Sequence, residues 1–155
     1  MKKILSLIVL GLIITSNAMA YEETGYETIK SNKVYEIRKY SDRLAIETAT
    51  SNQNSGFRKL FNYISGNNET NEKIKMTTPV TQMEKKGNMT MQFYLPSKFN
   101  KDNAPNPSRP DVEIVNIEGG YYAVIRYSGR SSDKNFIKHK EVLENELKKD
   151  NISIL

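Results

Sequence analysis

The chain of 155 residues contains no cysteine, no tryptophan and a single histidine, His139. Without cysteine it can form no disulfide, no thiolate site for zinc or an iron–sulfur cluster, and no cysteine nucleophile. One histidine excludes a metal site built from several imidazoles, and a Ser-His-Asp triad would have to use His139. These absences favour a binding protein over an enzyme.

Long apolar runs are scarce. An apolar stretch of 11 residues, 4–14, follows Lys2 and Lys3 and precedes the small-x-small triplet at residues 18–20. This pattern is typical of a secretory signal peptide cleaved after Ala20. A membrane anchor is the alternative, but spanning needs about 20 apolar residues and polar Thr15 ends this run. We therefore expect a signal peptide at residues 1–20, one domain at 21–155, and a periplasmic or secreted protein.

Composition and charge are those of an ordinary globular domain. The chain is 37% hydrophobic and 26% charged, with a mean hydropathy of −0.61 and a net charge of +5. Removing residues 1–20 takes away Lys2 and Lys3, leaving 21 basic and 18 acidic residues and a net charge of +3. Such a small excess, spread along the chain, does not predict a nucleic-acid partner. The triplet Asn68-Glu69-Thr70 matches a glycosylation sequon, a match that Asn-rich chains also produce by chance.

The order strand, strand, helix occurs twice along the chain. Alternating residues predict strands at 33–40 and 44–49, and again at 111–117 and 121–127. Apolar spacings of three and four predict helices at 56–64 and 133–149, the second capped by Ser131, Ser132 or Asp133. The residues expected on the buried faces of the two helices are Phe57, Leu60, Phe61 and Ile64, and Phe136, Ile137, Val142, Leu143 and Leu147. The repeat predicts a pseudo-twofold α+β domain with one curved sheet under two helices.

The segment between the two halves contains β-prone runs at 73–83 and 89–95. Residues 84–88 separate these runs and read as a hairpin turn. Residues 97–110 include Pro105, Pro107 and Pro110, which predicts an irregular connection on the surface.

Four segments, taken in order, resemble the SOUL haem-binding protein family. They are YEIRKY at 35–40, GFRKLFNYISGNN at 56–68, KIKMTTPVT at 73–81 and MQFYLP at 91–96. The resemblance covers essentially all of residues 21–155. It implies a curved, barrel-like β-sheet flanked by two helices, and tetrapyrrole binding without a defined redox reaction. Family members continue past the second helix into a closing strand. Here only residues 152–155 follow it, so we expect short or missing C-terminal strands and an open sheet edge.

The resemblance also indicates where a tetrapyrrole would bind. In the family, the first helix and nearby loops supply an apolar wall against the ring, and Phe57 and Phe61 stand at matching positions. Spaced four apart on a helix, the two rings can stack on one side of the ligand. The alternative is that both phenylalanines pack into the core, as apolar residues at this spacing commonly do.

Polar residues of the same helix are candidates for the propionates of the ring. Where family members carry a basic pair, this chain has Asn54 and Asn62. Arg58 and Lys59 are the nearest cations, and we assign Arg58 to the candidate site on this ground.

Two residues are candidates for the axial position on a haem iron. Lys39 stands where some relatives have the histidine proposed as the iron ligand. A lysine amine with its usual pKa of about 10.4 is protonated and cannot bind iron unless it is desolvated. His139 borders the apolar stripe of the second helix and is a weak metal candidate, because a lone histidine more often has no ligand role.

Three functions remain open at this point. The first is an exported, non-catalytic carrier or buffer for haem or another tetrapyrrole. The second is a small-molecule effector-binding or interaction module that has lost affinity for haem and takes another apolar ligand. The third is a hydrolase using Glu47, Glu113, Tyr122 or Tyr127, for which no nucleophile–base pair is legible. None of the three calls for a nucleic acid, and none requires a membrane span after cleavage.

Overall fold

The computed structural model describes residues 21–85, 87–130 and 132–154. The predicted signal peptide, residues 1–20, lies outside the described residues. The order of the elements is β1 (Glu22–Glu23), β2 (Glu27–Ser31), β3 (Tyr35–Tyr40), β4 (Arg43–Thr50), α1 (Gln53–Ile64), β5 (Thr77–Thr78), β6 (Val80–Lys85), β7 (Asn88–Tyr94), β8 (Glu113–Ile117), β9 (Gly120–Ile125) and α2 (Asp133–Lys149). The predicted α+β class is confirmed.

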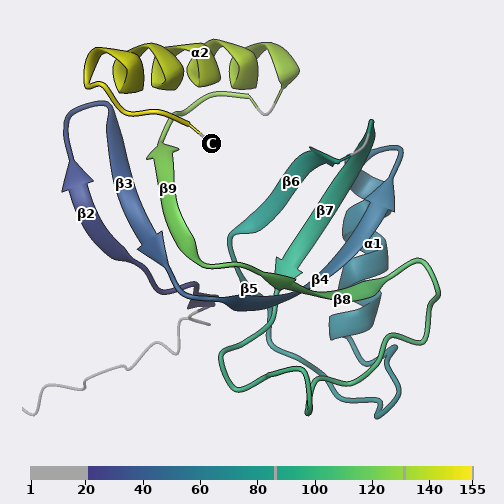
Figure 1. Ribbon diagram of the computed structural model, residues 1–155. Coiled ribbons are helices and arrows are strands. Elements are labelled where there is room, and N and C mark those ends of the chain that lie inside the picture. Colours follow the sequence, from purple (N-terminus) through teal and green to yellow (C-terminus); the bar gives the residue numbers. More distant parts are fainter. Residues whose placement is uncertain (1–20, 86, 131, 155) are drawn as a thin grey trace, which may run out of the picture.

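The strands form three sheets (Figure 1). The larger sheet has the order β6-β7-β4-β8 and carries α1 on one face. A second sheet has the order β2-β3-β9, and α2 lies across one end of it. The strands β1 and β5 form a short parallel pair between them. Within the described residues the sheets stay open and do not close into a barrel. No helix among these residues is long and apolar enough to span a membrane.

One long antiparallel ladder joins the two larger sheets. The first ribbon, β3 followed by β4, runs against the second, β8 followed by β9, in one unbroken register from Tyr35↔Ile125 to Glu47↔Glu113. The ribbons pass from sheet to sheet at Asp42 and Gly119, where the Asp42 carboxylate accepts a hydrogen bond of 2.8 Å from the Gly119 N–H. A Cβ on Gly119 would lie 2.5 Å from the Tyr40 carbonyl oxygen, so this crossing requires glycine. The order strand, strand, helix therefore occurs twice as predicted, in β3-β4-α1 and β8-β9-α2, but the strands lie in three sheets and not in the single curved sheet predicted.

The core lies between α1 and the sheet strands β4 and β7. It is an apolar cluster of buried side chains, namely Leu44, Ile46, Leu60, Tyr63, Ile64, Ile74, Met91, Phe93, Leu95, Phe99 and Val112. Leu44 and Ile46 alternate along β4 and face the helix, so Arg43 and Ala45 face the opposite side of the sheet.

The buried face of α1 differs from the predicted one. The helix buries Gly56, Leu60, Tyr63 and Ile64, and leaves Phe57 and Phe61 exposed. The reason is the close approach of the helix to β4. A Cβ on Gly56 would lie 2.9 Å from the Thr50 methyl, so the helix meets the sheet along its glycine edge.

The first helix also begins earlier than predicted. It starts at Gln53 rather than Gly56, because the Asn52 side chain accepts a hydrogen bond of 2.9 Å from the Ser55 N–H and caps the first turn. Residues 53–55, predicted as loop, are therefore helical.

The second helix has the predicted bounds, with Ser132 as its cap, but not the predicted buried face. Among its apolar residues only Leu147 is fully buried, while Phe136, Ile137 and Val142 are exposed and Leu143 is partly buried. The helix is anchored at its C-terminal end. Just past that end, Asp150 pairs with the Lys30 ammonium at 2.8 Å and accepts a hydrogen bond from the Tyr35 hydroxyl. These two partners lower the pKa of the Asp150 carboxyl.

The segment that connects the two units contains the predicted hairpin and one correction. The strands β6 and β7 pair antiparallel around the predicted turn. The run predicted as one strand at 73–83 is divided, because residues 73–76 form no strand and Pro79, which lacks an N–H, separates β5 from β6. Residues 97–110 are irregular as predicted. The strands β1 and β2 were not predicted, since their side chains are exposed and show no alternation.

The buried side chain of Asn68 holds the loop after α1 together through hydrogen bonds to its backbone. It is 2% exposed and donates hydrogen bonds to the carbonyls of Tyr63 and Glu72, at 3.0 and 2.7 Å. Its amide oxygen accepts a hydrogen bond from the Glu72 N–H. A glycan on the Asn68 Nδ2 would remove one of its two donated hydrogen bonds and would need room at a buried amide, so the folded protein disfavours glycosylation there.

Candidate functional site

Two phenylalanine rings lie side by side on the exposed flank of α1. The ring centroids of Phe57 and Phe61 are 5.9 Å apart, with 14° between the ring planes. The two side chains are 39% and 46% exposed. Phe57 also meets the buried ring of Phe93 edge to face at 5.2 Å, which fixes it against the sheet. The pair offers a partly exposed apolar surface that is supported by the sheet.

A polar stripe runs next to these rings on the same helix. Asn54, Arg58 and Asn62 are spaced four residues apart and are all exposed, so they lie above one another along α1. Within the described residues, none of these three side chains makes a hydrogen bond or an ion pair. Their amide and guanidinium N–H groups are therefore open to a ligand that rests on the phenylalanines.

Lys59, the other cation predicted near this surface, has partners within the protein. Its ammonium lies 3.1 Å from the Asp111 carboxylate and donates to the Ala49 carbonyl at 3.3 Å. Arg109 binds the same carboxylate through two hydrogen bonds, of 2.8 and 2.9 Å. Arg109 first, and Lys59 second, hold the pKa of Asp111 well below its usual range. Of the two helix cations, Arg58 is the one without an internal partner among the described residues.

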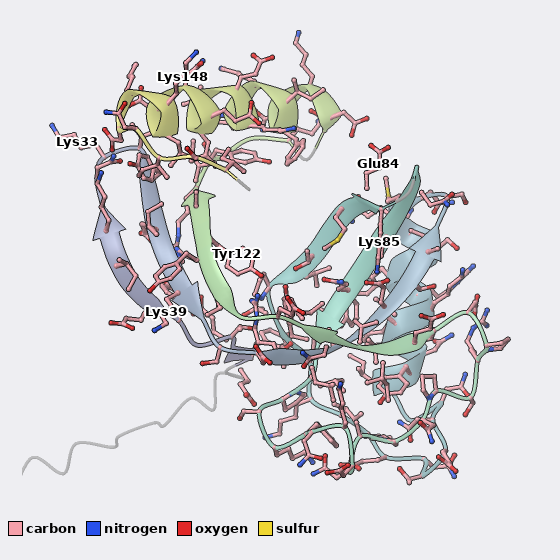
Figure 2. All side chains as sticks on the ribbon, viewed as in Figure 1. Lys33, Lys39, Glu84, Lys85, Tyr122 and Lys148 are labelled. Carbon is pink, nitrogen blue, oxygen red and sulfur yellow. The ribbon has the colours of Figure 1, made fainter. Side chains whose placement is uncertain are left out.

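Lys39 does not lie near this surface. It is on β3 of the other large sheet, exposed, with its ammonium 5.9 Å from the centroid of the Tyr121 ring (Figure 2). The helix α1 packs on the β6-β7-β4-β8 sheet instead. The structure therefore brings together Asn54, Phe57, Arg58, Phe61 and Asn62 and leaves Lys39 apart from them.

His139 has neighbours of its own on α2. Its ring stacks on Tyr127 with centroids 4.1 Å apart and 6° between the planes. Its Nδ1–H donates a hydrogen bond of 2.8 Å to the Asn135 carbonyl oxygen, which can only accept. The parts of the chain that the structure describes contain no group of three or more histidine or carboxylate side chains that could hold a metal ion.

Of the residues named for a hydrolase, Glu47 and Tyr122 are held in hydrogen bonds within the protein, and Glu113 lies directly opposite Glu47 in the β4–β8 pairing. Glu47 accepts hydrogen bonds from Gln92 at 2.6 Å and from Lys85 at 2.9 Å. The Tyr122 hydroxyl donates to the Glu118 carbonyl at 2.9 Å. These contacts occupy the groups in structural hydrogen bonds, and no nucleophile lies against a base in them.

Sequence reasoning missed a second cluster, in which Arg43 lies among the rings of three tyrosines. Its guanidinium carbon is 4.3 Å from the centroid of Tyr40, 4.8 Å from that of Tyr94 and 5.5 Å from that of Tyr122. The alternation of Arg43 with Leu44 and Ile46 was a usable signal, because it places a cation on the sheet face opposite the core.

The flank of α1 has the chemistry needed for a flat, apolar molecule with acidic groups. The rings supply contact area for the body of such a molecule, and the adjacent stripe supplies N–H donors for its acids. We call this surface, formed by Asn54, Phe57, Arg58, Phe61 and Asn62, the α1 flank.

Comparison with known proteins gives concordant matches. A family model described as SOUL heme-binding protein matches residues 21–154. Heme-binding protein 2 of Mus musculus is 32% identical over 129 residues, which cover 75% of this chain and 62% of the mouse protein. Heme-binding protein 2 of Homo sapiens is 37% identical over 93 residues, which cover 52% of this chain and 45% of the human protein. The matched part is less than two thirds of the length of either relative.

Proposed function

Because the chain belongs to the SOUL heme-binding protein family, we propose that it binds haem or a related tetrapyrrole on the α1 flank. We further propose that it acts as an exported carrier or buffer and not as a catalyst. The mouse and human relatives, each named Heme-binding protein 2, support the choice of ligand.

The observation that carries the proposal is the exposure of Phe57 and Phe61. Two adjacent aromatic rings, partly open to solvent and fixed against the sheet, leave apolar surface that a ligand can cover. Covering apolar surface stabilises a complex by roughly 25 cal/mol for each Å² removed from water. A porphyrin is a flat apolar disc, and two nearly parallel rings one helical turn apart are suited to contact it.

The polar stripe next to the rings supplies donors for the propionates. Arg58 offers a planar guanidinium, which matches a carboxylate with two parallel hydrogen bonds. Asn54 and Asn62, one turn before and one turn after Arg58, offer neutral amide donors. The stripe thus carries less positive charge than the basic pair of related proteins, and we expect electrostatic attraction to contribute less to the affinity for the propionates.

Binding on the α1 flank does not depend on an iron ligand at position 39. Lys39 lies on the other sheet, and the ring of His139 is stacked on Tyr127 of the second unit. When bound, the iron of haem could supply ligand exchange or electron transfer, but the residues of this surface hold the ring by its face and its acids. Haem and metal-free protoporphyrin should therefore bind with similar affinity.

Export is the part of the proposal that rests on residues 1–20. Their positive start, apolar stretch and small-x-small triplet support secretion with cleavage after Ala20. The intact mass of the protein recovered from the periplasm or the medium tests this directly. A chain that begins at Tyr21 supports export, and an uncleaved chain that stays inside the cell contradicts it.

The binding proposal is tested by titrating purified protein with haem and with protoporphyrin, following the Soret band. We expect saturable, one-to-one shifts for both ligands, with dissociation constants that differ by less than about threefold, since iron ligation would add several kcal/mol. A folded protein that leaves the Soret band unchanged would remove the proposal. Stabilisation by other amphiphiles, without any effect of haem, would then favour an effector-binding module.

A further inference from the structure

We propose a second ligand site, for a small organic carboxylate, at the guanidinium of Arg43. The guanidinium lies on the opposite face of β4 from α1, and the site is separate from the tetrapyrrole surface.

The first observation is that Arg43 lacks a polar partner. Its Nε is buried and has no hydrogen-bond acceptor among the described residues, and the guanidinium forms no ion pair there. Its neighbours are aromatic rings, those of Tyr40, Tyr94 and Tyr122, at 4.3 to 5.5 Å from the guanidinium carbon. A buried N–H without an acceptor is costly, and contact with ring faces offsets part of that cost without satisfying the donor.

Two other arginines, Arg38 and Arg109, each have a carboxylate partner within the protein. Arg38, which is also buried, binds the Glu36 carboxylate at 2.7 Å through Nε, donates to the Tyr40 hydroxyl and stacks on the Tyr26 ring at 4.0 Å. Arg109 binds Asp111 through two nitrogen atoms. Arg43 is distinguished from both by having rings around it but no carboxylate against it. Because its Nε is shielded from solvent, a ligand in the cavity would supply that contact at the terminal nitrogens of the guanidinium.

The second observation is a cavity of about 560 Å³ that Arg43 lines. This volume lies within the range of small-molecule sites, about 300–1,000 Å³. Tyr40 and Tyr94 line it beside Arg43, and the core residues Leu44, Leu95 and Phe99 also line it, so the cavity is not confined to the face of β4 opposite α1. The cavity therefore combines one fork-shaped cation with aromatic and aliphatic surface.

The charged residues of the cavity wall are two cations, Arg43 and Lys39, and three acids, so a negative group is held by direct contact with the Arg43 guanidinium and not by the net charge of the wall. Two of the acids there have partners, because Glu22 accepts from the Ser97 N–H and Asp42 accepts from the Gly119 N–H, each at 2.8 Å. Glu27 also lines the cavity and disfavours ligands with several negative charges.

A guanidinium binds a carboxylate through two parallel hydrogen bonds, and the tyrosine rings can contact a planar body attached to it. The ligand class is thus a small, planar organic acid with one carboxylate. The site does not share residues with the α1 flank, so the two can be tested independently.

The test uses the full, 15N-labelled chain with benzoate as the probe and benzamide, its neutral counterpart of similar size, as the control. We expect benzoate to shift the Arg43 Nε–H resonance saturably and benzamide to leave it in place. We expect Arg43→Gln to weaken benzoate binding about tenfold or more, since hydrogen bonds to a charged group are lost. The matched variant Arg126→Gln, which removes an exposed charge elsewhere, should bind benzoate as the unmodified protein does.

Three outcomes overturn the proposal: no saturable shift of the Arg43 resonance, equal binding of benzamide and benzoate, or equal binding of benzoate by Arg43→Gln and Arg126→Gln. If Arg43→Gln does not fold, the resonance of the unmodified protein decides. Haem titration of Arg43→Gln separates this site from the first one. Unchanged haem affinity supports two sites, and lost haem affinity in the folded variant assigns Arg43 to the tetrapyrrole and overturns the second site.

Discussion

Lys59 of α1 and Asp111, which precedes β8, form an ion pair of 3.1 Å between the first helix and the second strand–strand–helix unit. Arg109 completes the cluster by binding the same carboxylate. This pairing has two consequences. It ties α1 to the chain segment that enters β8, and it leaves Arg58 as the cation of the α1 flank that is open to a ligand.

Replacing Asp111 with asparagine should lower the free energy of unfolding by about 1 kcal/mol at neutral pH, because two half-exposed charge pairs are lost. The pKa of this carboxyl is lower in the folded protein than in the unfolded chain. Its contribution is therefore present above an unfolded pKa of about 3.9 and is lost as the pH falls toward the folded pKa. Urea unfolding at pH 7 and at pH 3 measures the difference.

The control for this prediction is Asp102→Asn, which removes an equal charge from the exposed loop 97–110. It should change the stability by less than about 0.5 kcal/mol at either pH. Equal losses for Asp102→Asn and Asp111→Asn would show that the cluster does not stabilise the fold.

Arg58→Gln should weaken haem binding by about two- to fivefold, as expected for one exposed pair with a propionate. Lys59→Gln removes the same charge one residue away and should leave the affinity within about a factor of two, because the Lys59 ammonium is held by Asp111. Soret titrations of the two variants at low salt make the comparison. A larger loss of haem affinity for Lys59→Gln than for Arg58→Gln would show that Lys59, and not Arg58, contacts the propionate.

Substitutions on the buried face of α1 should lower the free energy of unfolding much more than substitutions on the α1 flank. Changing the fully buried Leu60 to alanine should lower the free energy of unfolding by about 2–5 kcal/mol. Phe61→Ala, next to it, should lower the free energy of unfolding much less, because about half of the Phe61 side chain is already exposed to water. Chemical unfolding of both variants tests this, and a larger cost for Phe61→Ala would place that ring in the core.

The second helix is held mainly at its C-terminal end, by Leu147 and by Asp150. Leu147→Ala should therefore speed hydrogen exchange throughout α2 by at least about tenfold while β4 and β7 keep their protection. Val142→Ala, on the exposed side of α2, should leave exchange nearly unchanged. Equal effects of the two substitutions would mean that the helix is anchored elsewhere.

Most elements of the fold could be predicted because each has a local signal. Alternation marked β3, β4, β8 and β9, and capping together with period 3.6 marked α2 to the residue. The buried faces could not be predicted, because they depend on which side of a helix meets the sheet. At α1 that side is set by the approach of Gly56 to Thr50, which no helical periodicity reveals.

The candidate site was predicted in part, because only some of its residues are placed by a local pattern. Helical spacing alone predicts that the residues of the α1 flank lie on one surface, namely Asn54, Phe57, Arg58, Phe61 and Asn62. The positions of Lys39 and Arg43 depend on how the β3–β4 ribbon passes from one sheet to the other. This is a tertiary feature that local sequence patterns do not reveal. That crossing carries Lys39 away from α1 and places Arg43 among three tyrosines.

The most direct test of the account is the haem affinity of the double variant Phe57→Ser/Phe61→Ser against that of Tyr121→Ser. Tyr121, on β9, is an exposed aromatic ring outside the α1 flank and serves as the control. The account predicts that the double variant, still folded by circular dichroism, binds haem at least about tenfold more weakly, since two contacting rings are removed, while Tyr121→Ser binds it normally. Unchanged haem affinity in the folded double variant would contradict it.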